Sequence, residues 1–229
     1  MSSTTASRAD NAAAPAAYRE LENRFRRIAL VGNALNQLHW DQSVMMPPGG
    51  AGPRGEQIAA LAVIRHSALT DPAMDDLLAR AASQADGLDA WQAANLREMR
   101  RDHAHAAALP SDLVEALSTA TSNCETIWRT ARRDANFAAV LPALTEVLAL
   151  TRRKGEALSS AFGVGLYDAL LDAFEPDGRS AEIDPVFDAY AAFLPDFLDD
   201  VLARQKSFPA PELPSGLFLI DRQRALVRH

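Results

Sequence analysis

The sequence predicts an all-α fold, a multi-helix bundle, from three observations. Apolar residues recur three and four positions apart along most of the chain, which is the spacing of one face of an α-helix. No window alternates apolar and polar residues as a half-buried strand does, and this alanine-rich sequence lacks clusters of β-branched residues. Prolines and glycines fall between the periodic segments, where they interrupt helices.

A flexible tail that buries nothing is expected over residues 1–16, followed by a helix over residues 18–39. The apolar face of that helix consists of Tyr18, Leu21, Phe25, Ile28, Leu35 and Leu38. Paired prolines and glycines predict a rigid connector over residues 45–53 rather than a phosphate-binding loop, because no strand precedes it and no Lys-Ser/Thr pair ends it. A second helix is expected over residues 54–68.

Several residues predict where the next helices begin. Asp71 is expected to be an N-cap with Pro72 in the first helical position, opening a helix that ends near Gly87. Helices over residues 88–107 and 111–133 follow. Asn136 is the expected N-cap of a helix that ends near Phe162.

The C-terminal part predicts a short helix over residues 167–174 and a long helix with a steady apolar rhythm. The residues of that rhythm are Ile183, Phe187, Tyr190, Leu194, Phe197 and Val201. Pro195 is expected to kink the long helix. Asp221 is the predicted N-cap of a last helix, which stops after two turns without glycine, proline or a polar tail; this predicts truncation.

Composition excludes several classes of protein. Hydrophobic residues make up 48% and charged residues 23%, so the chain is globular rather than disordered. The net charge of −7 opposes binding to nucleic acid. The single cysteine, Cys124, cannot form an internal disulfide, and apolar runs are far shorter than the roughly 18 residues of a membrane span. We therefore expect a cytoplasmic protein without nucleic-acid or membrane partners.

The residues alone predict no catalytic and no metal site. None of the five histidines is paired at the i, i+4 spacing of a helical zinc site. His103 and His105 point roughly 200° apart on a helix, and we expect both to be solvent-exposed. Cys124 is expected to be a buried thiol, and arginine doublets such as Arg100-Arg101 are expected to lie on solvated surface.

Several strings of residues carry a resemblance to a known family. They are Trp40-Asp41-Gln42, Met46-Pro47-Pro48-Gly49-Gly50, and residues 54–61, 128–132, 136–137, 141–144 and 167–176. In these residues the chain resembles the N-terminal part of the carboxypeptidase Taq family of zinc metallocarboxypeptidases, from Tyr18 to the C-terminus. Val44 departs from the pattern, since the family more usually has threonine there.

The resemblance implies that residues 17–229 form the N-terminal helical region of a zincin-type carboxypeptidase, truncated before its catalytic half. It implies a long substrate groove, release of C-terminal residues from peptides, and commonly a homodimer. In that family the zinc ligands, the general base and the carboxylate-recognising arginine lie in the second half of a chain about twice as long. No catalytic or metal residue is therefore transferred, and the chain alone is expected to bind no zinc. Trp40 and Asp41 are candidates for the groove wall, although a buried tryptophan that anchors a helix end is the favoured role of Trp40.

Three hypotheses follow. The first is that the chain is a carboxypeptidase shortened by a gene break, an artificial boundary or a split gene, which binds peptide only if the missing half is supplied and which has a second copy or a complementing polypeptide as its partner. The second is a non-catalytic helical module that binds a peptide or a partner. The third hypothesis is an unrelated bundle that resembles the family by chance.

Overall fold

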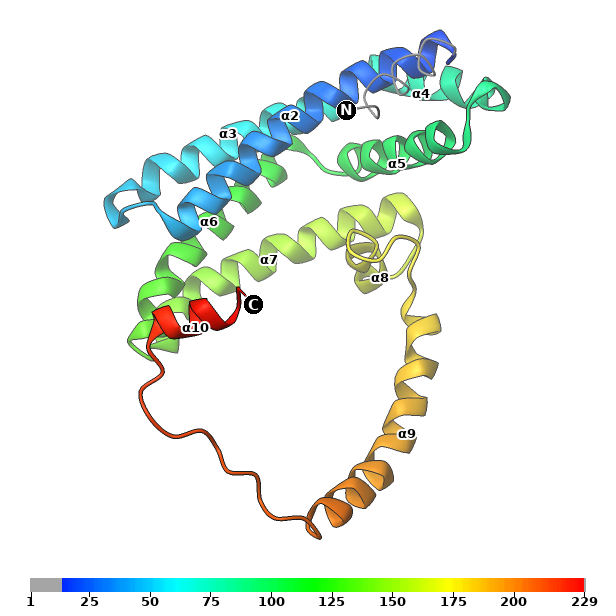
Figure 1. Cartoon of the computed structure of the whole chain (residues 1–229). Coiled ribbons are helices and arrows are strands. Elements are labelled where there is room, and N and C mark those ends of the chain that lie inside the picture. Colours follow the sequence, from blue (N-terminus) through cyan, green and yellow to red (C-terminus); the bar gives the residue numbers. More distant parts are fainter. Residues whose placement is uncertain (1–13, 229) are drawn as a thin grey trace. The chain divides into compact units, whose positions relative to one another are not determined.

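The computed structural model describes residues 14–228, and every regular element in that range is helical, which confirms the all-α prediction. The elements are α2 (Ala16–Val44), η1 (Pro48–Gly50), α3 (Ala51–Leu69), α4 (Ala73–Ser83), η2 (Ala85–Gly87), α5 (Ala90–Ala107), α6 (Ser111–Arg133), α7 (Phe137–Phe162), α8 (Leu166–Leu171), α9 (Ser180–Gln205) and α10 (Ile220–Leu226) (Figure 1). The chain divides into two compact units, with the boundary between Asp177 and Gly178. No helix in the described range is both long and apolar enough to cross a bilayer.

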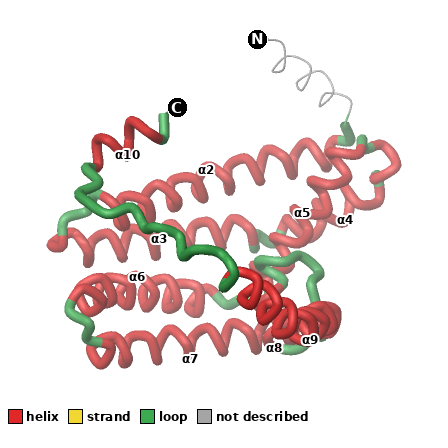
Figure 2. Tube along the Cα trace, turned by 60° about the horizontal axis from the view of Figure 1, so that its bottom comes forward, coloured by secondary structure: helices red, strands yellow, loops and turns green. Residues whose placement is uncertain are grey.

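The first unit is a layered set of helices. α3 packs against both α2 and α6, and α6 packs against α7 (Figure 2). α4 and α5 pack against one another and against α2 and α3, respectively, while α8 packs against α7. This order places α3 at the centre of the unit, where it holds α2 and α6 in position.

Two apolar cores stabilise these contacts. The first is formed by α2, α4, α5 and the end of α3, and its buried members include Tyr18, Leu21, Ile28, Leu69, Met74, Leu77, Leu78, Leu96 and Met99. The second lies between α6 and α7 around Leu113, Ala120 and Leu150. The expected burial of Tyr18, Leu21 and Ile28 is confirmed, because the 3–4 spacing places them on one face.

The predicted tail over residues 1–16 lies almost entirely outside the described residues. At its described end Ala14 is buried in the first core and α2 begins at Ala16, so the expectation that residues 1–16 bury nothing is wrong there. α2 then continues to Val44, beyond the expected end near residue 39. α3 begins at Ala51 rather than residue 54, because Pro53 falls in its first turn, where a helix needs no backbone donor.

The helix caps agree with the sequence in part. Asn136 caps α7, since its side chain accepts a hydrogen bond from the backbone N–H of Ala139 at 3.2 Å. Asp71 Oδ1 accepts from the N–H of Ala73 at 2.8 Å, but Pro72 rather than Asp71 occupies the N-cap position of α4. The prediction for Asp221 is wrong: the N-cap of α10 is Leu219, and Asp221 lies in the first turn.

The second unit contains α9 and α10. α9 continues as one helix through Pro185 and Pro195, and none of its side chains is buried. The kink at Pro195 stays a prediction. Phe193 and Phe197 stack on each other with ring centroids 5.0 Å apart.

Gly155 of α7 tests how closely α8 packs. A Cβ atom added there would lie 2.9 Å from Cγ and Cδ2 of Leu166, closer than carbon atoms approach. We expect Gly155→Ala to lower the free energy of unfolding by about 1–2 kcal/mol, because overpacking outweighs the better helix propensity of alanine. Chemical denaturation measures the difference.

Gly52 of α3 provides the matched control, since nothing lies within 4 Å of a Cβ built there. Gly52→Ala should leave stability unchanged or raise it. Equal effects of the two substitutions would contradict the tight α7–α8 contact.

Candidate functional site

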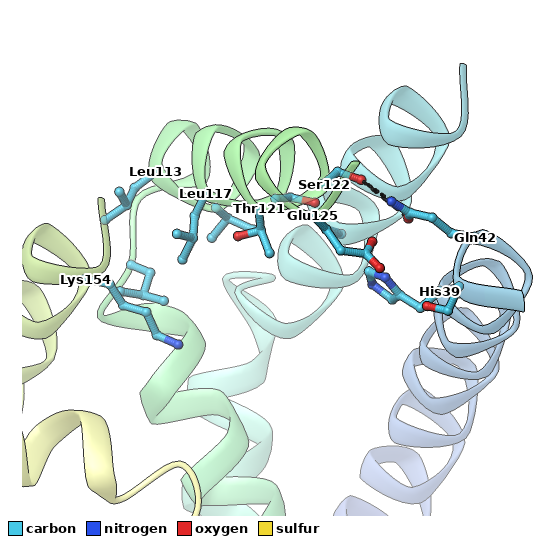
Figure 3. A pocket seen from close by; sticks show the side chains of 13 residues that line it. His39, Gln42, Leu113, Leu117, Thr121, Ser122, Glu125 and Lys154 are labelled. Atoms are coloured by element: carbon cyan, nitrogen blue, oxygen red, sulfur yellow. Dashed lines mark hydrogen bonds between the residues drawn. The ribbon is translucent and has the colours of Figure 1, made fainter. Parts of the chain in front are cut away.

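A cavity of about 510 Å³ opens between α2, α3, α6 and α7, and we call it the α6 cavity because α6 supplies most of its wall (Figure 3). Its lining residues are His39, Gln42, Ser43, Ala62, Leu109, Leu113, Val114, Leu117, Ser118, Thr121, Ser122, Glu125 and Lys154. The leucines provide an apolar floor. Polar side chains stand around it, with Lys154 on one side and His39 and Glu125 on the opposite side (Figure 3).

A buried hydrogen bond fixes one edge of the α6 cavity. Gln42 is 2% exposed, and its Nε2 donates to Ser122 Oγ at 3.1 Å. Arg129 of α6 donates to the backbone carbonyl of Gln42 and also forms an ion pair with Glu125. Because burying an amide without a partner is costly, these bonds hold the last turn of α2 against α6.

Trp40 and Asp41, the two groove candidates, do not line the α6 cavity, although their neighbours His39 and Gln42 do. Trp40 is 53% exposed, so the expectation of a buried tryptophan is wrong. Residues two positions apart on a helix point to opposite sides, and α2 uses the side of Gln42 for packing. Asp41 forms an ion pair with Arg54 of α3, whose Nη1 also donates to the carbonyl of Leu38.

A second cavity of about 450 Å³ adjoins the first, and we call it the cationic cavity. The two cavities share the lining residues Ala62, Leu109, Val114 and Lys154. The basic residues of the cationic cavity are Arg65, His66, Arg101, His105 and Lys154, and its one lining acid is Asp102. Burial lowers the pKa of His66, although the hydrogen bond to the backbone of Leu109 favours its protonated form.

Asp172 joins α5 to the segment that follows α8. Its Oδ2 accepts from Arg101 Nη2 at 2.9 Å and lies 2.7 Å from His105 Nε2, while its Oδ1 accepts from the N–H of Asp177 at 2.9 Å. Burial alone would raise the pKa of Asp172, but the bonds from His105 and Asp177 and the charge of Arg101 lower it overall. The expectation that Arg101 lies on solvated surface is therefore wrong.

His103 is buried and His105 is half-buried, so the expectation that both histidines are solvent-exposed is wrong. Its Nδ1 lies 2.8 Å from the carbonyl oxygen of Leu69 and its Nε2 lies 2.9 Å from Asp75 Oδ1. His103 and His105 thus have separate carboxylate partners. Across residues 14–228, no group of three or more His, Cys, Asp or Glu side chains is arranged to hold a metal ion.

Cys124 is half-buried rather than buried, and its thiol is free. The sequence did not indicate that Arg65 and Lys154 line the same cavity. Nothing in the local sequence of either residue indicates it, because they lie on different helices, α3 and α7.

Comparison with known proteins identifies relatives. The family model described as carboxypeptidase Taq (M32) metallopeptidase matches residues 20–229. The chain is 34% identical over 201 residues to thermostable carboxypeptidase 1 of Thermus thermophilus, covering 83% of this chain and 39% of that protein. It is 28% identical over 183 residues to thermostable carboxypeptidase 1 of Pyrococcus furiosus, covering 80% of this chain and 36% of that protein.

Solved structures show the same relationship. Metallocarboxypeptidase 1 of Trypanosoma cruzi matches with a TM-score of 0.77 and 34% identity, over 93% of this chain and 42% of that chain. The crystal structure of BsuCP matches with a TM-score of 0.75 at 22% identity, over 82% of this chain and 38% of that chain, which supports the fold alone.

The Asp172 cluster predicts how stability depends on pH. Because the folded state lowers the pKa of Asp172, the cluster stabilises the fold above the unfolded-state pKa near 4, and this contribution is lost as pH falls through the folded-state pKa. Asp172→Asn should cost about 1–3 kcal/mol at pH 7, since it leaves Arg101 without its charged partner. The difference from the unsubstituted protein should shrink at acid pH, where Asp172 itself is protonated.

Urea denaturation at a series of pH values measures this effect. Glu156→Gln, at an exposed position of α7, is the control and should change stability little at any pH. A cost of Asp172→Asn that stays constant down to pH 2 would contradict the role of the carboxylate charge.

Proposed function

Because this chain belongs to the carboxypeptidase Taq (M32) metallopeptidase family, we propose that it is part of a metal-dependent carboxypeptidase that releases C-terminal residues from peptides. The match over residues 20–229 is the observation that carries this proposal. The chain spans about two fifths of the length of the curated relatives it matches, at 39% and 36%. The proposed activity therefore belongs to a complete enzyme of which this chain supplies the helical N-terminal part.

The described residues do not fit a zinc site. A catalytic zinc needs three protein ligands around one ion, and no group of three potential ligands exists in the range that the structure describes. His103 and His105, the histidines nearest to each other in sequence, are bonded to Asp75 and Asp172, respectively. We propose that the zinc donors of the complete enzyme lie outside the residues that the structure describes, and that this chain alone neither binds zinc nor cleaves peptides.

Trp40 and Asp41 remain our candidates for the groove wall of the complete enzyme. The half-exposed ring of Trp40 supports this role, because it is accessible to a ligand. Exposed apolar side chains on one face of α7 support a protein partner, either the complementing polypeptide or a second copy of the chain. They are Phe137, Leu141, Leu144 and Leu148. A cytoplasmic location is part of the proposal, supported by the single cysteine.

A second candidate function is a non-catalytic helical module that binds a peptide or partner. The α6 cavity favours it, since a cavity of about 510 Å³ can hold a small ligand without any metal. A monomer that melts cooperatively and binds little hydrophobic dye would favour this module, whereas strong dye binding and aggregation would favour the incomplete enzyme.

The purified chain tests the main proposal directly. We expect no stoichiometric zinc by elemental analysis and no release of C-terminal amino acids from an N-blocked peptide. Chelator-sensitive activity should appear only after the second half of a family member, which carries the zinc ligands, is fused to the chain or co-expressed with it. If the chain alone bound one equivalent of zinc and released C-terminal amino acids in a chelator-sensitive reaction, the proposal that the zinc donors lie elsewhere would be contradicted.

A further inference from the structure

We propose that the α6 cavity and the cationic cavity together bind a carboxylate that carries an apolar group. The site lies wholly within the first unit and requires no zinc. It is therefore independent of the proposed peptidase activity.

The charge of the cationic cavity supports an anionic ligand. Arg101 and His105 share the Asp172 carboxylate, so their charge is already balanced in part. Arg65 and Lys154 have no ion-pair or hydrogen-bond partner among residues 14–228. Both side chains are half-buried, so water compensates their charges less completely than at the surface.

Asp102, the acid that lines this cavity, is exposed and forms no ion pair or hydrogen bond with Arg65 or Lys154 within residues 14–228. Two basic groups without countercharge in one cavity suit an anion, because a carboxylate accepts charge-assisted hydrogen bonds from both. Arg65 reaches the cavity from α3, where its side chain lies against Gly32 of α2.

The adjoining α6 cavity supports an apolar group on the same ligand. Leu109, Leu113 and Leu117 line its floor, and Leu109 also lines the cationic cavity. Since Lys154 and Leu109 line both cavities, a carboxylate bound at Lys154 lies beside the leucines that can receive the apolar group.

The polar side chains also set the direction of the ligand. Lys154 lies on the side of the α6 cavity opposite to Glu125 (Figure 3). A ligand carboxylate would be repelled by Glu125 and attracted by Lys154. The apolar group therefore lies between the two, over Leu117.

N-acetyl-L-phenylalanine and its primary amide form a matched pair of probes, since they differ in the charged carboxylate. Titration calorimetry or NMR titration of the purified chain, with a chelator present throughout, should show the acid binding at least about tenfold more tightly than the amide. Acetate, which lacks the apolar group, should also bind at least about tenfold more weakly than the acid.

Substitutions locate the site. Lys154→Gln and Arg65→Gln should each weaken binding of the acid by about tenfold, while Lys154→Arg should retain most of it. Arg152→Gln, at an exposed position of α7, is the control and should bind as the unsubstituted chain does. Urea denaturation of each variant verifies that it is folded.

The proposal is overturned if the chain does not bind the acid, if acid and amide bind equally, or if both Gln variants retain full affinity. Because zinc is excluded from every measurement, a failure of the peptidase proposal leaves these outcomes unchanged, and the reverse also holds.

Discussion

The Asp172 carboxylate is the interaction on which much of the first unit depends. α8 has six residues, too few to be a stable helix without tertiary contacts. Asp172 follows its last turn and accepts from Arg101 and His105 of α5, while the ring of His105 packs edge-on against Phe162 at the end of α7. The buried carboxylate therefore links α5 to the end of α8, and the ring of His105 extends this contact to α7. The same bonds occupy Arg101 and His105, which leaves Arg65 and Lys154 as the basic groups of the cationic cavity that are available to a ligand.

The side chains of Gln42 and Ser122 hold helices together at the edge of the α6 cavity, as Asp172 does beside the cationic cavity. α2 and α6 both pack against α3, and the hydrogen bond between these two side chains joins them directly across it. A buried polar pair contributes little net stability, but a displaced partner would leave an unsatisfied amide, so the pair specifies one arrangement of the helices. The α6 cavity lies between this pair and Lys154. Its shape thus follows from polar contacts between helices rather than from the apolar cores alone.

Features that depend on the spacing of nearby residues were predicted correctly from the sequence. Contacts between residues far apart in the sequence were not. The face of α2 with Tyr18 and Leu21 and the cap at Asn136 depend on neighbours within a few residues, and both are confirmed. The partner of Arg101 lies 71 positions away and that of Gln42 lies 80 positions away, so neither contact has a local signal. The residues shared with the family indicated the segment around Trp40, but they did not indicate which side of the helix lines a cavity. The structure shows that His39 and Gln42, on the other side of α2, line the α6 cavity.

The steady apolar rhythm of α9 shows a further limit of periodicity. Phe187, Tyr190 and Phe197 recur at helical spacing, and each is at least half exposed in the second unit. Such spacing indicates an apolar face whose burial lowers the free energy, but it does not identify the element that packs against it. An isolated helix gains little from propensity alone, so tertiary contact is the usual source of its stability. Within the first unit, Phe137, Leu141, Leu144 and Leu148 form another exposed apolar face on α7, and a face of this kind is typical of a surface that binds another polypeptide.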